Sequence, residues 1–283
     1  MITDAKKQHY VPRFYLKNFS NVSKNEYYIF CFDKEKNTSY TNNIKQIAQE
    51  NKFYETEEVS IENGLGKLER IASIHIKKLI QHEKYKLLND KQLRFDLSEY
   101  IITQYIRTKA MRIKIEEFLE KLPNKEKLMA EFPYSDQFEN TCDEAKFGHI
   151  ALTSDQDRYL QSQIAMKKWI LIKNKTELNF WTSDNPIVTF NKNGTSYLNK
   201  PESHIFFPIT PKLCLCFANP EYYVNFNTQK RSYGIKSILN NIENATMYKM
   251  TKENEVKCIN NLQYKFSTRH IFSKEDDFEE LTR

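Results

Sequence analysis

Residues 7–20 read KQHYVPRFYLKNFS, a stretch that combines a histidine, an arginine and several aromatic side chains near the start of the chain. Its apolar side chains lie at spacings near those of a helix that buries one face; they are Tyr10, Phe14, Tyr15, Leu16 and Phe19. Proline is tolerated in a first helical turn, so residues 13–19 are predicted to form a short buried helix with His9 beside its start. A histidine and an arginine in this position suggest an anion site without identifying the anion.

Three later segments accompany this stretch in a fixed order. They are NKFY at residues 51–54, QYIRT at residues 104–108, and SDNP at residues 183–186 followed by FPITPK at residues 207–212. With HYVPRFYL at residues 9–16, these segments resemble the signature of a bacterial family, domain of unknown function 4238. The resemblance covers most of the chain, from residue 7 to residue 212. Some members of that family resemble stand-alone proteins encoded among bacterial anti-phage defence genes, which implies an intracellular effector or sensor.

One position departs from the family pattern. In the family, the segment that corresponds to QYIRT usually continues Arg-Thr-Pro, whereas this chain has Arg107-Thr108-Lys109. Without the proline, a helix predicted over residues 92–119 need not break there.

Length and composition favour one folded domain. The chain has 283 residues, of which 40% are hydrophobic, and its five glycines and eight prolines form no linker. We expect one composite domain with an N-terminal α/β segment (1–60), a helical layer (61–175), a sheet-rich part (176–272) and an acidic tail (273–283). The formal net charge of +6 favours a nucleic-acid or nucleotide partner only slightly, because solvated lysine faces are common.

Targeting and cysteine patterns indicate a cytoplasmic protein. Residues 1–6 lack the apolar core of a secretory signal, and no run approaches the roughly 20 apolar residues of a membrane span. The five cysteines are scattered and form no Cys-x-x-Cys pair, so neither disulfides nor structural zinc is indicated. Cys214 and Cys216 alternate as on one face of a strand, which predicts buried core residues.

The pattern of apolar residues predicts an α+β fold with an N-terminal helix and β-hairpin, a central helical layer, and a C-terminal, mostly antiparallel sheet with a covering helix. Strands are predicted at residues 27–33, 38–41, 52–55, 178–182, 187–190, 203–208, 213–218 and 256–259. Helices are predicted at residues 61–79, 92–119 and 154–172, and the covering helix at 232–251.

His9 and Asp184 are the candidate catalytic residues. Histidine is the commonest general acid or base near neutral pH, and an aspartate after a strand is a common base or metal ligand. The alternatives are a structurally satisfied histidine and an Asx-type turn in which the carboxylate of Asp184 binds backbone amides. No Glu-x-Lys follows Asp184 as in restriction-type nucleases, and the pair His75/His82 lacks further ligands, so no metal site is assigned, although a divalent cation at Asp184 stays open.

Arg13, Gln104 and Arg107 are the candidate anion-binding residues. A guanidinium binds phosphate or carboxylate through two parallel hydrogen bonds. Gln104 and Arg107 are three apart on a predicted helix, so they can present an amide and a cation to one ligand. The alternative is a buried ion pair of Arg107 with Glu62 or Glu69, and Tyr15 is a supporting residue beside this group.

Two functional hypotheses remain open. The first is a nuclease that cleaves phosphodiesters with His9, Asp184 and the two arginines as an anti-phage defence effector. The second is a non-catalytic sensor that binds a nucleotide or phage component in the Arg/Gln pocket. A third, purely structural hypothesis is that every motif serves only to hold the core of the protein together.

Overall fold

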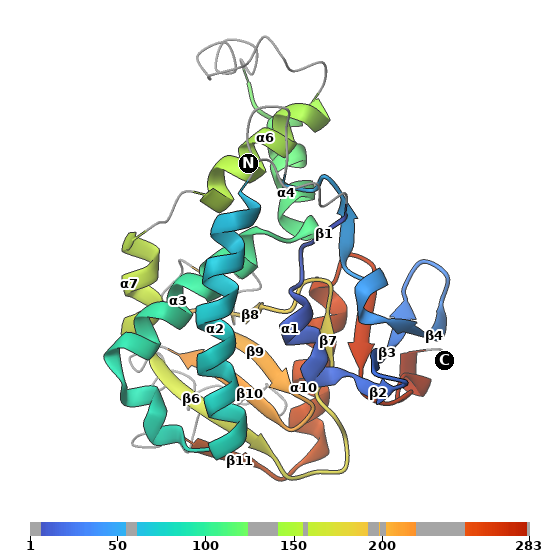
Figure 1. The fold of residues 1–283 in the computed structure, drawn as a ribbon, viewed down its shortest axis with the longest axis vertical. Helices are drawn as coiled ribbons and strands as arrows, with labels where there is room; N and C mark the ends of the chain where they lie inside the picture. The colour runs from blue at the N-terminus through green and yellow to red at the C-terminus, as the bar shows by residue number, and fades with distance from the viewer. Residues whose placement is uncertain are drawn as a thin grey trace.

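A computed structural model describes residues 7–54, 61–123, 141–154, 158–191, 198, 202–218 and 247–281. Within these ranges the chain forms two five-stranded sheets and one two-stranded sheet, with helices packed around them (Figure 1). The predicted α+β class is therefore confirmed.

The N-terminal strands form two hairpins. Strand β3 (Glu26–Asp33) pairs antiparallel with β2 (Asn21–Ser23) and with β4 (Thr38–Asn43). Between β2 and β3, Lys24 and Asn25 have φ values of 49° and 62°, the left-handed geometry of a two-residue hairpin turn. The β3–β4 pair confirms the predicted hairpin.

The same sheet is extended by strands from distant parts of the chain. β12 (His270–Ser273) pairs antiparallel with β3, and β7 (Thr182–Ser183) pairs with β12. The predicted strand at 178–182 is wrong except at its last residue. The side chain of Asn260 accepts from the N–H of Trp181 at 2.9 Å and donates to the carbonyl of Asn179 at 2.9 Å, so this backbone bonds to a side chain rather than to a strand.

The second five-stranded sheet lies in the C-terminal half. Its order is β11 (Met247–Met250), β6 (Lys168–Asn174), β10 (Leu213–Ala218), β9 (His204–Thr210) and β8 (Val188–Phe190). Only the β11–β6 pair is parallel among these described strands. A mostly antiparallel C-terminal sheet is thus confirmed.

Strand β6 has a separate core on each face. Trp169 and Leu171 belong to the large core shared with the helical layer, whereas Ile170 and Ile172 belong to a second core with helix α10 (Glu253–Phe266). A strand that is covered on both faces has a continuous run of apolar residues, and such a run cannot be told from a buried helix by its sequence pattern. The helix predicted at 154–172 is therefore wrong from Lys167 onward, because α7 (Arg158–Met166) ends before it and β6 begins at Lys168. Residues 155–157 of that prediction lie outside the described residues.

The helix that covers the far face of this sheet is α10, through Val256 and Ile259. The strand predicted at 256–259 is wrong, because the apolar positions 256, 259, 262 and 266 follow a helical period. Of the covering helix predicted at 232–251, residues 247–250 form β11 instead, and residues 232–246 lie outside the described residues.

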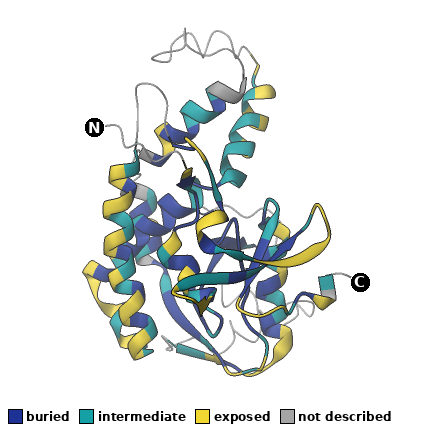
Figure 2. Cartoon of the chain, turned by 45° about the vertical axis from the view of Figure 1, so that its right-hand side comes forward, coloured by how far each residue is buried: buried dark blue, intermediate teal, exposed yellow. Residues whose placement is uncertain are grey.

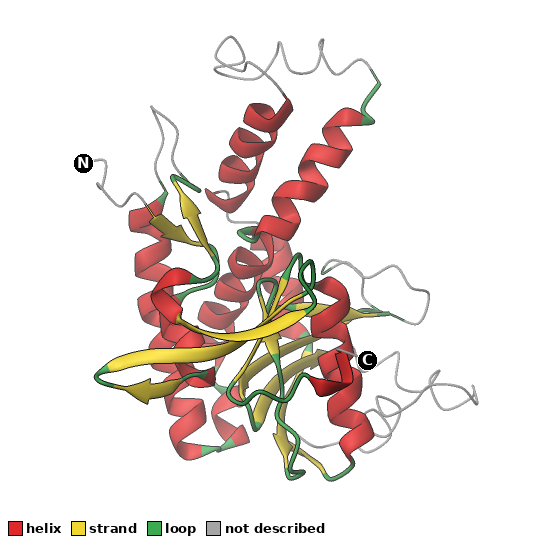
Figure 3. Cartoon of the chain, turned by 90° about the vertical axis from the view of Figure 1, so that its right-hand side faces the viewer, coloured by secondary structure: helices red, strands yellow, loops and turns green. Residues whose placement is uncertain are grey.

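The helical layer covers the near face of the sheet in Figure 1. It contains α2 (Glu62–His82) and α3 (Lys91–Ile106), while α4 (Lys109–Glu120) and α6 (Thr141–Ser154) lie side by side at one end of the molecule (Figure 3). The expected continuous helix at 92–119 is wrong, since Thr108 is extended with φ −80° and ψ 158°. The hydroxyl of Tyr54 donates to the carbonyl of Arg107. In a continuous helix, this carbonyl would accept from the backbone N–H four residues later.

The N-terminal segment enters this layer as a short strand and helix. β1 (Lys7–His9) pairs antiparallel with β5 (Gln49–Asn51), and α1 (Arg13–Leu16) follows Pro12 and continues as a 3₁₀ turn to Phe19. The short buried helix is confirmed. The strand predicted at 52–55 is wrong for residues 52–54, which form a turn with φ 47° at Lys52, and residue 55 lies outside the described residues.

Buried side chains concentrate on the sheets and on the inner faces of the helices (Figure 2). Cys214 and Cys216 are fully buried in the core beneath α10, which confirms their predicted place on one face of a strand. Among the residues placed by the structure, no helix is long and apolar enough to cross a membrane.

Gly64 and Gly66 on α2 give a test of the helical layer. A methyl group added at either position would meet nothing within 4 Å. We expect Gly64→Ala and Gly66→Ala each to raise the free energy of unfolding by about 0.5–1 kcal/mol, because glycine loses more backbone entropy in a helix. Urea unfolding measures this, and a decrease for either variant would contradict the described environment of α2.

Candidate functional site

Arg107 lies in the interior at the end of α3, with only 2% of its surface exposed. Its Nη1 donates to Glu69 Oε1 at 2.7 Å, its Nη2 to the backbone carbonyl of His9 at 2.7 Å, and its Nε to the hydroxyl of Tyr54 at 3.2 Å. Burial opposes the charge, but Tyr54 and Glu69 outweigh it and raise the pKa of Arg107. The guanidinium therefore links α3 to α2 and to the N-terminal segment.

One of the two acidic residues considered as partners of Arg107 forms an ion pair with it in the structure. Glu69, in the second turn of α2, makes the ion pair at 2.7 Å, whereas Glu62 at the start of that helix is not a partner of the guanidinium. The interpretation of Arg107 as half of a buried ion pair therefore describes its side chain better than an open anion site does.

Gln104 binds the same N-terminal segment one residue further along. Its Nε2 donates to the carbonyl of Tyr10 at 2.9 Å, next to the His9 carbonyl that Arg107 holds. The spacing of three residues does place Gln104 and Arg107 on one face, as expected. What this face binds is the backbone of the chain itself.

The imidazole of His9 is only partly buried. Its Nε2–H donates to the carbonyl of Ile44 at 3.3 Å. Burial lowers the pKa of His9 to about 4, with the cations Arg13 and Arg107 acting in the same direction and the Ile44 bond opposing them. The ring is therefore neutral at pH 7.

Arg13 and Tyr15 are neighbours on α1 with opposite environments. Arg13 is exposed and makes no side-chain hydrogen bond or ion pair within the described part of the chain. Tyr15 is fully buried, stacks on Phe207 with ring centroids 4.9 Å apart, and donates its hydroxyl to the carbonyl of Pro208 at 2.6 Å. Tyr15 thereby joins α1 to strand β9.

Asp184 follows β7 and is almost fully buried. Its Oδ1 accepts from the backbone N–H of Thr268 at 2.8 Å, and its Oδ2 accepts from those of Arg269 at 2.7 Å and His270 at 2.8 Å. Burial raises the pKa of Asp184, and these three N–H groups oppose that rise. An aspartate that binds backbone amides was the structural alternative, but the amides belong to residues 268–270, which lead into β12, rather than to its own turn.

The predicted site residues therefore fall into separate groups. His9, Gln104 and Arg107 meet at the N-terminal segment, with Arg13 near enough to affect His9. Among the described residues, no hydrogen bond or ion pair joins His9 to Asp184. Nor do three or more His, Cys, Asp or Glu side chains in these ranges gather as a metal site.

His149 is a buried polar residue that sequence reasoning missed. Its Nε2–H donates to the carbonyl of Ile106 at 2.7 Å, and its Nδ1 accepts from Arg112 Nη2 at 3.1 Å. The ring lies against those of Phe53 and Tyr54, in the second family segment. Burial and then the charge of Arg112 lower the pKa of His149 to about 3. The partners come from two distant parts of the chain, residues 53–54 and 106–112, so no local spacing signals them.

The fold and these contacts define a mixed α+β protein in which three of the four motif segments meet around the buried Arg107. The chain belongs to the family described as Protein of unknown function (DUF4238), whose model matches residues 7–277. No curated protein and no solved structure matches the chain in the comparisons made.

Asp184→Asn is expected to lower the free energy of unfolding by about 1–3 kcal/mol, because an amide nitrogen in place of either oxygen leaves at least one buried N–H without an acceptor. Urea unfolding measures this. Asp276→Asn, at an exposed position, is the matched control and should change stability by less than about 0.5 kcal/mol. A stable Asp184→Asn variant would show that the three N–H bonds contribute little.

Acid should destabilise the fold through three histidines whose pKa is lowered in the folded protein. The pKa is lowered from 6.5 to about 4 in His9 and His204 and to about 3 in His149, in each case mainly by burial. Below pH 6.5 the unfolded chain therefore binds more protons than the folded one, and stability falls as the pH drops toward these folded-state values.

We expect His149→Gln to reduce the slope of unfolding free energy against pH by about one proton, or about 1.4 kcal/mol per pH unit, between about pH 5.5 and 4. Urea unfolding at a series of pH values gives this slope. An unchanged slope would mean that His149 is not held neutral in the folded protein.

Proposed function

We propose that this protein acts in bacterial anti-phage defence as a non-catalytic sensor that binds a phosphate-bearing ligand. The defence role rests on the resemblance of its motifs to those of family members encoded among defence genes. The competing hypothesis is a nuclease that uses His9 and Asp184 as its acid/base pair.

The main support for this proposal is the use of the motif side chains inside the protein. Gln104 and Arg107 bind the carbonyls of Tyr10 and His9, and the carboxylate of Asp184 accepts three backbone N–H groups. A catalytic pair needs its groups within one hydrogen bond or one water of the same substrate. These contacts favour a structural role for the three side chains.

The electrostatics of His9 also favour binding over proton transfer. General acid–base catalysis is most efficient when the catalytic pKa lies near the working pH. With a pKa of about 4, the imidazole of His9 is neutral at pH 7, so it cannot act as an imidazolium acid. The same low pKa makes the ring a weak base. His9 fits better as a neutral ring beside a cationic surface.

Exposed cations surround His9 and form what we term the basic surface: Lys7, Arg13 and Lys45. Lys7 is two residues from His9 in β1 and so lies on the same face of that strand. Lys45 follows Ile44, whose carbonyl binds His9, and its ammonium is paired with Glu26 at 2.6 Å. Arg13 is exposed and forms no ion pair in the described chain, although its charge acts on the carboxylate of Glu26. A guanidinium in this position can bind a phosphate through two parallel hydrogen bonds.

The test measures binding and cleavage with the same probes, ATP and a 5′-phosphorylated single-stranded oligonucleotide. Calorimetry should give saturable binding of at least one probe to the wild-type protein, and Arg13→Glu should weaken it by at least about tenfold by replacing attraction with repulsion. Binding should also weaken as salt is raised. Lys252→Glu, an exposed charge reversal at the start of α10, is the control and should bind like wild type.

Cleavage of the oligonucleotide with Mg²⁺ or Mn²⁺ separates the two hypotheses. The sensor proposal expects no cleavage by the wild-type protein. If the wild-type protein cleaves the oligonucleotide and the folded variants His9→Gln and Asp184→Asn both do not, the sensor proposal is overturned and the nuclease hypothesis is supported. Failure of both probes to bind would overturn the assignment of the basic surface as the ligand site.

A further inference from the structure

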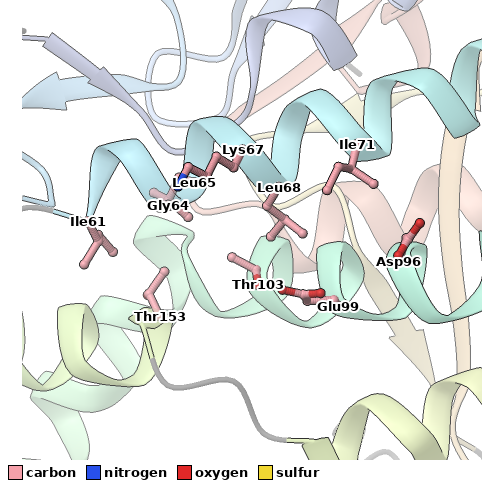
Figure 4. A pocket seen from close by; sticks show the side chains of 10 residues that line it. All are labelled: Ile61, Gly64, Leu65, Lys67, Leu68, Ile71, Asp96, Glu99, Thr103 and Thr153. Atoms are coloured by element: carbon pink, nitrogen blue, oxygen red, sulfur yellow. The ribbon is translucent and has the colours of Figure 1, made fainter.

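Between helices α2 and α3 lies a pocket of about 440 Å³ (Figure 4). Its α3 wall carries Asp96 and Glu99. Asp96 already accepts from His75 Nε2 at 2.8 Å and from Gln92 Nε2 at 2.7 Å, and Glu99 also interacts with other groups of the chain. These charges are therefore used within the protein, and we assign the pocket no ligand.

Strand β4 is an open edge of the N-terminal sheet. It pairs with β3 along one side, and none of the described strands lies along its other side. It spans six residues, whereas the strands that end the two five-stranded sheets, β2, β7, β8 and β11, span two to four residues each in the described chain. Natural proteins keep open edges short, because unpaired backbone N–H and C=O groups recruit further strands.

The outer edge of β4 also lacks the features that normally block such pairing, which are charges, prolines and bulges. Its sequence TSYTNN contains neither a charged residue nor a proline, and its register against β3 is regular from Thr38 to Asn43. Residues 38–41 are all exposed, and Tyr40 keeps 37% of its surface in solvent. The β3–β4 hairpin lies at the outside of the molecule in Figure 1. This edge is therefore long, uncharged and accessible.

The geometry of an antiparallel ladder limits how two copies of β4 can pair. Along β4 the backbone groups face β3 and the outside in alternation, so outward residues pair only with outward residues and a two-fold axis must pass through a residue. The two most extensive choices are Tyr40, which pairs residues 38–42, and Thr41, which pairs residues 39–43. The second choice uses the N–H of Asn43, which already donates to the side chain of Asn42 at 2.8 Å. The axis at Tyr40 leaves that contact intact.

The pairs that face each other in this register are compatible. Tyr40 meets Tyr40 of the second copy, and Ser39 meets Thr41 of the second copy. Aromatic pairs and pairs of hydroxyl residues stabilise antiparallel sheets, whereas like charges in direct opposition destabilise them. Residues 38–42 contain no charge that could repel its counterpart.

Charges just beyond the strand are complementary. The same register brings Glu35, in the turn before β4, toward Lys45 of the second copy, and both side chains are well exposed at 65% and 46%. Each also has a partner in its own chain, Arg269 for Glu35 and Glu26 for Lys45. This pair therefore adds attraction at the rim and does not anchor the interface.

We propose that this protein forms a two-fold dimer in which β4 pairs antiparallel with β4 of a second copy, with Tyr40 on the axis. The pairing joins the two N-terminal sheets into one continuous sheet, and its main-chain hydrogen bonds supply most of the attraction. The dimer goes beyond the proposed phosphate-binding function and can stand or fail without it.

Sedimentation velocity of the full-length chain tests the dimer. Between about 1 and 200 µM the wild-type protein should change from monomer to dimer, since one strand pair makes a small interface of modest affinity. Tyr40→Lys places two ammonium groups on the axis and should weaken the dimer at least about tenfold. Val22→Lys, at a 66% exposed position of β2, is the matched control and should dimerise like wild type.

A single cysteine tests the register. Residues in direct opposition have Cα atoms about 4.5–5.5 Å apart, within reach of a disulfide, so Tyr40→Cys should give a cross-linked dimer on mild oxidation. Thr38 lies on the same face of β4 but meets Asn42 of the second copy. The two copies of residue 38 are therefore about 13 Å apart along the strands, so Thr38→Cys should stay uncross-linked, as should the wild type.

Three outcomes would overturn the proposal. A protein that stays monomeric over this range leaves the edge of β4 to an extended segment of another protein. A dimer that Tyr40→Lys leaves intact does not use β4. A folded Thr38→Cys variant that cross-links as readily as Tyr40→Cys contradicts the register. Circular dichroism shows whether each variant is folded.

Discussion

The buried guanidinium of Arg107 is the contact on which the arrangement of the N-terminal half depends. It joins α2 through Glu69, the turn after β5 through Tyr54, and β1 through the carbonyl of His9. A buried cation is tolerated only when its donors are used, and removing one partner of such a pair destabilises a protein strongly. Because β1 is held in this way, α1 follows at a fixed position, and Tyr15 can reach the carbonyl of Pro208 in the C-terminal sheet.

Sequence patterns predicted the elements whose burial is decided by their own residues. The hairpin around β3, helix α2 and strands β8, β9 and β10 were all indicated by local periodicity. The errors occurred where a partner from elsewhere decides the structure. Residues 169–172 form a strand because α10 covers their second face, and α3 ends where the hydroxyl of Tyr54 takes the carbonyl of Arg107. Neither partner can be read from the segment itself.

The candidate site shows the same limit at the level of single side chains. The shared face of Gln104 and Arg107 followed from their spacing in the sequence. Their partners did not, because the carbonyls of His9 and Tyr10 lie 98 and 94 positions away, respectively. For Asp184 the acceptor chemistry was foreseen, whereas the N–H groups of residues 268–270 were not. A motif therefore identifies a constrained side chain more reliably than it identifies a ligand.

Strand β12 has a consequence for how the protein is made. Asp33 at the end of β3 and Arg269 just before β12 are 236 positions apart, and their side chains meet at 2.7 Å. On the ribosome, β4 follows β3 closely, but much of the other edge of β3 stays unpaired until residues 270–273 have been synthesised. An unpaired strand edge is a template for association with other chains. Prematurely terminated products would keep that edge open, which makes them substrates for chaperones and proteases.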